Sequence, residues 1–165
     1  ILCAAFHHRN GPQIEYVYPP LPGMPPTPVA LDDPTAERAA VVLPDAWQFL
    51  PFICLPDGGH ASEEAFIYFH LPPVPAWTIA GAGGDDNDDN GGGGGGDATL
   101  FGLACYRQMP AADLLQRPSD VTRSMVQKAV VVLASDPVLS GMRDKLGMVT
   151  AALFAQRDFS DLRLL

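Results

Sequence analysis

Short apolar runs broken by turn signals predict a two-stranded hairpin at the start of the chain. The continuous apolar stretch Ile1–Phe6 is typical of a strand that is buried on both faces. The Asn10-Gly11 pair predicts a two-residue turn, after which Gln13–Tyr18 alternates between apolar and polar residues. That alternation divides the second strand into two faces: Ile14, Tyr16 and Tyr18 on one, Gln13 and Glu15 on the other.

The next two apolar segments predict a short helix and a strand. Apolar residues recur at near-helical spacing in Leu43–Leu55, where Asp45 is placed to cap the start. Because Pro51 lies inside this segment, the helix must be kinked or begin late. The aromatic-rich segment Glu64–Leu71 alternates with a period of two and predicts a strand.

The last third of the chain predicts two further strands and the longest helix. Thr99–Gln108 is strand-like, and β-branched residues favour a strand over a helix at Val126–Leu133. Asp136-Pro137 would open the final helix, because this pair suits a cap followed by proline. Its apolar positions follow a helical period: Leu139, Met142, Leu146, Val149 and Leu153. The order β-β-α-β-β-β-α predicts an α+β fold, an antiparallel sheet covered by short helices.

Two loops interrupt this pattern without dividing the chain, which we treat as a single domain over residues 1–165. Residues 19–42 form a proline-rich loop with six prolines between positions 19 and 28, for which a plain loop is favoured over a PxxP ligand. The segment 81–97 holds nine glycines and five aspartates, so we expect a disordered loop. Strand-like residues resume directly after it, as in an enlarged hairpin connection.

Length and charge narrow the classes of function. The chain has 165 residues, which gives room for one domain, and a net charge of −9. Residues 1–98 carry thirteen acids against Arg9 and Arg38, whereas residues 99–165 carry eight bases against six acids. Because a phosphate backbone requires a basic face, no nucleic-acid partner is expected. No apolar run approaches the roughly 20 residues of a membrane-spanning helix.

Motifs that carry chemistry are weak in this sequence. Cys3, Cys54 and Cys105 are widely spaced in apolar stretches, so we expect buried, reduced thiols. The four histidines lack metal-binding spacing: His7, His8, His60 and His70. No nucleophile elbow, Walker loop or dinucleotide-binding motif follows a strand. The sequence therefore predicts no catalytic, cofactor-binding or metal-ligating residue.

The glycine/aspartate loop does contain a spacing similar to that of a calcium loop. The matching positions are Asp86, Asp88, Asn90, Gly91 and Asp97. An EF-hand needs helices on both sides of such a loop, and here the flanks are proline-rich and strand-like. Weak attraction of cations is therefore favoured over a specific calcium site.

Longer strings of residues are more informative than these short motifs. In chain order they are Phe6–His8, Glu15–Pro20 (EYVYPP), Trp47–His60 (WQFLPFICLPDGGH), Phe69–Pro73, Leu100–Gln108 (LFGLACYRQ), Asp120–Arg123 with Val126–Lys128, and Phe154–Ser160 (FAQRDFS). As an ordered set across nearly the whole chain, they resemble the N-terminal, upstream part of DENN-domain proteins of the late-secretory-pathway Avl-type family. The departures from the family pattern are the two loop insertions.

The resemblance implies a longin-like fold, a five-stranded antiparallel sheet with one helix on one side and two on the other. The order would become β-β-α-β-β-β-α-α, with the last helix dividing near Phe154. The resemblance also implies a larger protein, with a central DENN lobe after Leu165. Because the chain begins at Ile1 and ends inside an apolar stretch, we interpret it as part of a longer protein or as an incomplete gene model.

The resemblance further implies a role in vesicle transport from the late Golgi to the plasma membrane. The implied partners are a Rab-type GTPase and the downstream DENN lobe, with peripheral association to Golgi, vesicle or endosome membranes from the cytoplasm. A guanine-nucleotide exchange factor shifts a binding equilibrium of the GTPase and needs no nucleophile, so the chain is not expected to be an enzyme by itself. The alternative is a longin-type interaction scaffold without exchange activity. Asp57, His60 and Arg107 are the polar motif residues expected to face a partner.

Overall fold

The computed structural model describes residues 1–21, 24–31, 38–56, 62–74, 99–117 and 121–165. The glycine/aspartate loop 81–97, with its calcium-like spacing, lies outside these residues. Asp57 and His60 also lie outside them, as do parts of the proline-rich loop 19–42.

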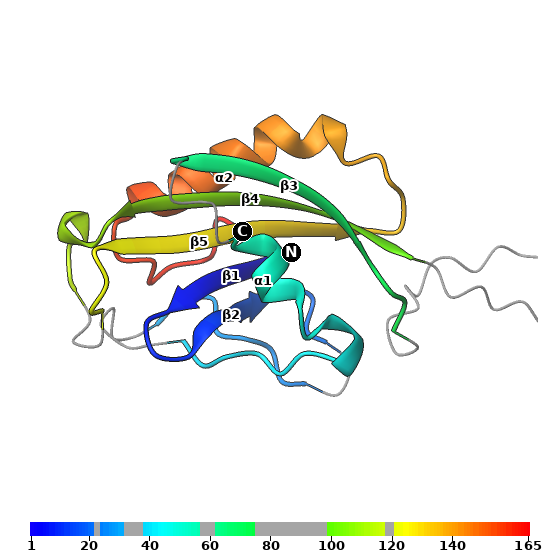
Figure 1. Cartoon of the computed structure of the whole chain (residues 1–165), viewed down its shortest axis with the longest axis horizontal. Coiled ribbons are helices and arrows are strands. Elements are labelled where there is room, and N and C mark those ends of the chain that lie inside the picture. Colours follow the sequence, from blue (N-terminus) through cyan, green and yellow to red (C-terminus); the bar gives the residue numbers. More distant parts are fainter. Residues whose placement is uncertain (22–23, 32–37, 57–61, 75–98, 118–120) are drawn as a thin grey trace, which may run out of the picture.

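A five-stranded antiparallel sheet forms the centre of the described structure (Figure 1). Its strands are β1 (Leu2–His7), β2 (Gly11–Val17), β3 (Glu64–Leu71), β4 (Leu100–Pro110) and β5 (Met125–Ala134). Their order across the sheet is β2-β1-β5-β4-β3, with antiparallel pairing throughout. All five predicted strands are confirmed. The strands β3 and β4 are antiparallel neighbours, as an enlarged hairpin connection requires.

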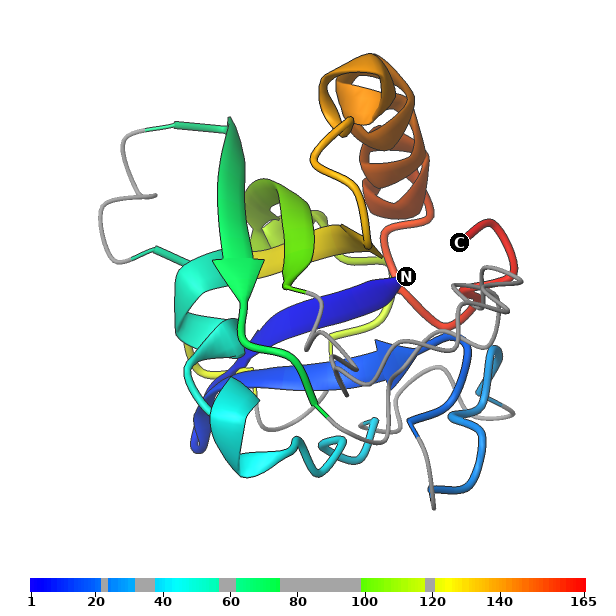
Figure 2. The ribbon, with the colours of Figure 1, turned by 90° about the vertical axis from the view of Figure 1, so that its right-hand side faces the viewer.

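Among the described residues, one α-helix covers each face of the sheet (Figure 2). The helix α1 (Leu50–Cys54) follows a 3-10 turn at Asp45–Trp47, and α2 (Arg143–Ala155) follows one at Ser140–Met142. A third 3-10 turn, Ala111–Asp113, follows β4. This α+β arrangement confirms the predicted fold class and is compatible with a longin-like fold. Residues 156–165 form turns and one isolated bridge.

Each face of the sheet has its own apolar core. On the α1 face, Trp47 is fully enclosed, and its indole nitrogen donates to the Pro72 carbonyl at 2.9 Å. On the α2 face, Leu146 and Leu153 pack with Leu103 of β4. The chain after α2 continues this second core through Phe159 and Leu162, so the C-terminal residues are part of the packed structure.

Three local predictions are corrected. Asp45 makes no capping hydrogen bond, whereas the expected late start of the helix is confirmed, since α1 begins at Leu50 with Pro51 in its first turn. The helix α2 begins at Arg143, well after Asp136-Pro137, because the intervening residues form turns that include Gly141, a poor helix former. The hairpin turn holds three residues, since His7 pairs with Gly11. Gly11, directly after the turn, has φ +80°, a left-handed conformation that glycine adopts without strain.

A β-bulge changes the predicted alternation of β2. Cys3 pairs with Tyr16 and Ala4 pairs with Ile14, which leaves Glu15 unpaired between them. The extra residue moves Ile14 and Tyr16 to opposite faces: Ile14 packs in the α1 core and Tyr16 in the α2 core. A bulge redirects the side chain that it leaves unpaired, and here it directs Glu15 into the α2 side of the sheet.

The proline-rich loop is more ordered than a plain loop in the part that is described. Thr27 Oγ1 accepts from the Val17 amide at 3.0 Å and donates to the Val17 carbonyl at 2.9 Å. Further along, Leu31 N donates to the Ser160 carbonyl at 3.0 Å, and Leu162 N donates to the Val29 carbonyl at 2.7 Å. These bonds attach the loop to the C-terminal residues.

Candidate functional site

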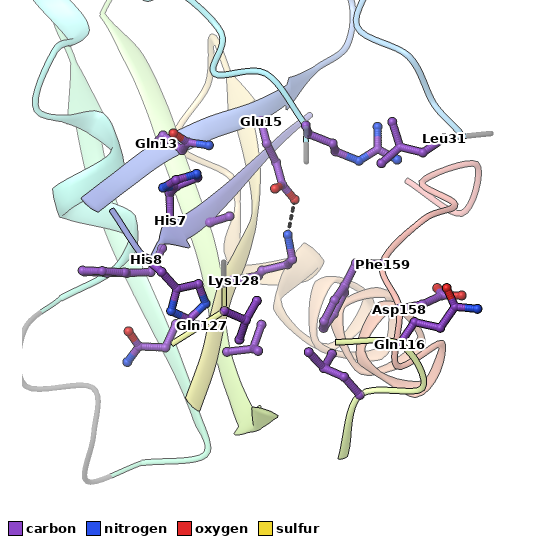
Figure 3. A pocket seen from close by; sticks show the side chains of 16 residues that line it. His7, His8, Gln13, Glu15, Leu31, Gln116, Gln127, Lys128, Asp158 and Phe159 are labelled. Carbon is purple, nitrogen blue, oxygen red and sulfur yellow. Dashed lines mark hydrogen bonds and ion pairs between the residues drawn. The ribbon is translucent and has the colours of Figure 1, made fainter. Parts of the chain in front are cut away.

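A half-open pocket lies where the β1–β2 hairpin, the start of β5 and the C-terminal residues meet (Figure 3). We call it the hairpin pocket. Its cavity volume is about 110 Å³. The polar lining is His7, His8, Gln13, Glu15, Arg38, Gln116, Gln127, Lys128 and Asp158, and the apolar lining is Ala5, Phe6, Leu31, Leu114, Val121, Val126 and Phe159. The pocket therefore offers a polar surface and an apolar surface side by side.

A buried ion pair crosses the floor of the hairpin pocket. Lys128 Nζ donates to Glu15 Oε1, and both side chains are at least nine-tenths buried (Figure 3). The Cys3 thiol donates to the same carboxylate oxygen at 3.4 Å. Burial raises the pKa of the Cys3 thiol well above its ordinary value, and the Glu15 charge raises it further. The thiol thus remains protonated and acts as a donor to the ion pair.

Phe159 forms the wall opposite the hairpin. Its ring lies 5.0 Å from Lys128 Nζ, a cation–π contact, and meets Phe154 edge-on with 5.1 Å between the ring centroids. The backbone of Phe159 has φ +57°, which is costly for a bulky residue. The hydrogen bonds of Ser160 to the Asp158 carboxylate, 3.1 Å each, hold the turn that imposes this conformation.

Arg38 closes the pocket from the proline-rich side. Its guanidinium donates to three backbone carbonyls, of Pro28, of Val29 at 3.2 Å and of Ser160 at 2.7 Å. Arg38 is only 9% exposed, and no hydrogen-bond partner of its Nε lies in the described part of the chain. Among the described residues, the guanidinium is therefore hydrogen-bonded to neutral carbonyl oxygens.

The histidines at the rim are held by the backbone. His7 Nδ1 accepts from the amides of Arg9 and Asn10, at 3.1 and 3.0 Å, and so organises the hairpin turn. His8 Nδ1 accepts from the Arg123 amide at 3.2 Å, and the Arg123 guanidinium stacks 3.9 Å above the Phe6 ring. Within the described ranges, no cluster of three His, Cys, Asp or Glu side chains is arranged to hold a metal ion.

Of the residues predicted to face a partner, the structure describes Arg107, which does not line the hairpin pocket. Arg107 belongs to β4, where its Nε donates to Glu64 of β3 at 2.8 Å, and both side chains are one-third exposed. Its partner-facing role remains a prediction. Asp57 and His60 lie outside the described residues.

Sequence reasoning did not identify the hairpin pocket, although two signals pointed to it. Arg38 is one of two bases among the first 98 residues, and Glu15 is the charged residue of the second strand. In addition, pocket residues come from five of the segments that carry the family resemblance: Phe6–His8, Glu15–Pro20, Asp120–Arg123, Val126–Lys128 and Phe154–Ser160. Their convergence on one cavity became apparent only once the fold was known.

Comparison with known proteins agrees with the resemblance. The sequence model of the family "Transport protein Avl9" matches residues 1–165. The chain belongs to this Avl9 family of transport proteins. It is 39% identical over 168 residues to the late secretory pathway protein avl9 of Schizosaccharomyces pombe, covering 100% of this chain and 28% of that relative. It is 36% identical over 169 residues to the late secretory pathway protein AVL9 of Saccharomyces cerevisiae, covering 97% of this chain and 19% of that relative. No solved structure matches.

The family is described as one of transport proteins, and both named relatives are proteins of the late secretory pathway. The chain spans less than a third of the length of either relative. As for the membrane itself, none of the described helices is long and apolar enough to span it.

Proposed function

We propose that this chain is the N-terminal lobe of a DENN module that binds a Rab-type GTPase and promotes exchange of its GDP for GTP. The process would be transport from the late Golgi to the plasma membrane. The chain would act from the cytoplasm, together with a downstream DENN lobe, on Golgi, vesicle or endosome membranes with which it associates peripherally.

The observation that carries this proposal is the coincidence of family and fold. The Avl9 match extends over the whole chain, and its described residues form a five-stranded antiparallel sheet with helices on both faces, which is compatible with the longin-like fold of an upstream DENN region. Exchange requires only that the nucleotide-free GTPase be bound more tightly than the GDP-bound form. A surface that binds the GTPase is sufficient for this, without any chemical step by the chain.

The helix α1 offers such a surface. Phe49 is 76% exposed and Phe52 is 58% exposed, although both belong to a segment whose other side fills the α1 core. The Phe52 amide donates to the Phe49 carbonyl at 3.1 Å, which places the two residues on the same side of one turn. Exposed aromatic residues dominate the energy of many protein interfaces, so we propose this pair as the point of contact with the GTPase.

The test is release of fluorescent GDP from a panel of Rab GTPases, measured with the chain alone and with the chain joined to its downstream sequence. Acceleration for one GTPase by the longer protein would support the proposal and identify the substrate. If no GTPase responds, and the chain nevertheless binds a trafficking protein stably, the function is that of an interaction scaffold and the exchange proposal fails.

A further inference from the structure

The two edges of the sheet differ in how they are covered. At the β2 edge, Thr27 Oγ1 of the proline-rich loop bonds to both the amide and the carbonyl of Val17. The Val41 amide also donates to the Ile14 carbonyl there, at 2.7 Å. At the β3 edge (Figure 2), no backbone bond to a further strand is found among the described residues. An edge strand with open N–H and C=O groups is a template for pairing with another strand.

The sequence of β3 lacks the features that usually keep an edge strand unpaired. Proteins protect such edges with prolines, bulges or charged side chains. From Ala65 to Leu71 the strand holds no Asp, Glu, Lys, Arg, Pro or Gly, and its register against β4 is regular. Tyr68 is 54% exposed, and the neighbouring Ile67 and Phe69 are half-buried. Pairing with a further strand would remove this apolar surface from water.

The hydrogen bonds to β4 determine which backbone groups of β3 point outward. In the β3–β4 register Glu63 lies opposite Gln108, and the Gln108 amide donates to the Glu63 carbonyl at 3.2 Å. Hydrogen-bonded pairs alternate along an antiparallel ladder, so the odd-numbered residues of β3 bond to β4. The even-numbered residues therefore direct their N–H and C=O groups away from the sheet: Glu64, Phe66, Tyr68 and His70.

These four residues are complementary to the same four residues of a second copy. When two β3 strands run antiparallel about a two-fold axis at Ile67, Phe66 lies opposite Tyr68 and Glu64 lies opposite His70. Every outward N–H and C=O group of the four residues then has a partner. The contacts are an aromatic pair and a carboxylate beside an imidazole donor, both favourable across strands. Each occurs twice, as a two-fold interface requires.

The neighbouring register is less complementary. With the axis at Tyr68, Glu64 would lie opposite Pro72, which has no N–H to donate. With the axis at Ile67, the paired segment ends before Pro72, and Ile67 meets its own counterpart on the α1 face.

We propose that β3 pairs with β3 of a second copy of this chain, antiparallel and centred on Ile67, so that one continuous sheet runs through both copies. The contact is only one strand wide, so the dimer is weak and forms as the concentration of the chain rises. Its test needs no GTPase, and the outcome therefore does not depend on the proposed exchange activity.

Sedimentation velocity of the chain over a wide range of concentration measures this association. A reversible monomer–dimer equilibrium is expected. Tyr68→Lys should raise the dissociation constant about tenfold or more, because it removes both aromatic pairs and brings two positive charges close to the axis. Leu115→Lys is the matched control and should associate like the wild type, since Leu115 is 64% exposed and lies outside β3.

Two results of this experiment would overturn the proposal. A chain that stays monomeric up to millimolar concentration would mean that a different strand covers β3, such as one from elsewhere in a longer protein. Association of Tyr68→Lys as tight as that of the wild type would place the contact between copies away from β3.

A disulfide determines the register. Ile67→Cys places two thiols at the axis, in a non-hydrogen-bonded pair whose Cα atoms lie about 4.5 Å apart, so dissolved oxygen should link the copies covalently. His70→Cys is the control, because position 70 lies roughly 20 Å from its counterpart in this register. The three native thiols are buried. Linkage of His70→Cys as readily as Ile67→Cys would contradict pairing centred on Ile67. If Ile67→Cys does not fold, sedimentation of Tyr68→Lys, at an exposed position, still decides the question.

Discussion

At the scale of single residues, Gly102 shows how closely the sheet is packed. A Cβ at this position would lie 2.2–2.8 Å from three ring atoms of Phe69, its partner across β3 and β4. We expect Gly102→Ala to destabilise the protein by about 1–3 kcal/mol, because the ring must leave its place against the α1 core. This loss is expected although alanine is ordinarily favoured over glycine inside a strand. Urea unfolding measures the change in the free energy of unfolding.

The matched control for Gly102 is Gly141, which is exposed and has no neighbouring atom within 4 Å of an added Cβ. Gly141→Ala should be neutral or stabilising by up to about 1 kcal/mol, since alanine restricts the unfolded chain. Equal effects of the two substitutions would show that Phe69 moves aside without cost.

The buried pair Glu15–Lys128 is a second residue-scale case. Lys128→Met leaves the Glu15 carboxylate buried without its partner, and we expect a loss of about 3–5 kcal/mol. The double variant Glu15→Leu/Lys128→Met should recover most of this loss, because no charge then remains. A double-mutant cycle by urea unfolding tests this, with Arg107→Met at the one-third-exposed Glu64 pair as a control expected to cost at most about 1 kcal/mol. Additive effects of the two substitutions would contradict the coupling.

The three buried thiols make the stability of the protein sensitive to alkaline pH. Burial raises the pKa of Cys3, Cys54 and Cys105 in the folded protein, whereas the unfolded thiols titrate near about 8.5. Above that pH the unfolded state binds fewer protons than the folded state, so the free energy of unfolding falls as pH rises. Each thiol adds up to about 1.4 kcal/mol per pH unit.

Urea unfolding between pH 7 and 9.5 measures this slope before the buried tyrosines contribute, whose pKa values are also raised by burial. The triple variant Cys3→Ala/Cys54→Ala/Cys105→Ala should lose the slope. A slope that persists in the triple variant would assign the effect to other groups.

At the scale of elements, regular patterns were sufficient to predict the sheet. Period-two alternation predicted β3 at its observed bounds. β-branched residues correctly favoured a strand over a helix at β5. The pattern was not sufficient at β2, because a bulge at Glu15 inserts one residue without any mark in composition. The start of α2 was also predicted wrongly. Asp136-Pro137 is a suitable helix start by local sequence, but whether a helix begins there depends on tertiary packing, and α2 begins at Arg143.

The exposed aromatic residues Phe49 and Phe52 at the start of α1 allow a prediction about this helix. Phe49→Ser/Phe52→Ser should change the free energy of unfolding by no more than about 0.5 kcal/mol, because both side chains are largely in water. The same variant should weaken GTPase binding tenfold or more if the pair is the contact proposed above. Val138→Ser, at a 76% exposed position beyond β5 and before α2, is the control. Exchange at the wild-type rate by the double variant would remove α1 from the interface.

At the scale of the whole molecule, the hairpin pocket exists because distant segments meet. Arg38, Lys128 and Phe159 come from three parts of the chain that no short-range pattern connects. Each of these residues could be singled out in the sequence by its charge or by a string that resembles the family. Only the tertiary fold brings them to one cavity. Candidate chemistry was therefore predictable residue by residue, and its location was not.

The bonds between the proline-rich loop and the C-terminal residues carry the final prediction. Leu162 is fully buried, and its amide donates to the Val29 carbonyl at 2.7 Å while Leu31 N donates to Ser160 at 3.0 Å. Leu162→Ala should cost about 2–5 kcal/mol and also loosen the loop, so that the Leu31 amide exchanges its hydrogen sooner than the β5 amides do. Leu115→Ala, at an exposed site, is the control. If the Leu31 amide keeps the protection of the sheet in Leu162→Ala, the loop is held by Arg38 and Thr27 rather than by the C-terminal residues. In that case the hairpin pocket would keep its shape without the C-terminal packing. Early exchange of the Leu31 amide would instead mean that the contact with the C-terminal residues holds both the proline-rich loop and the pocket in place.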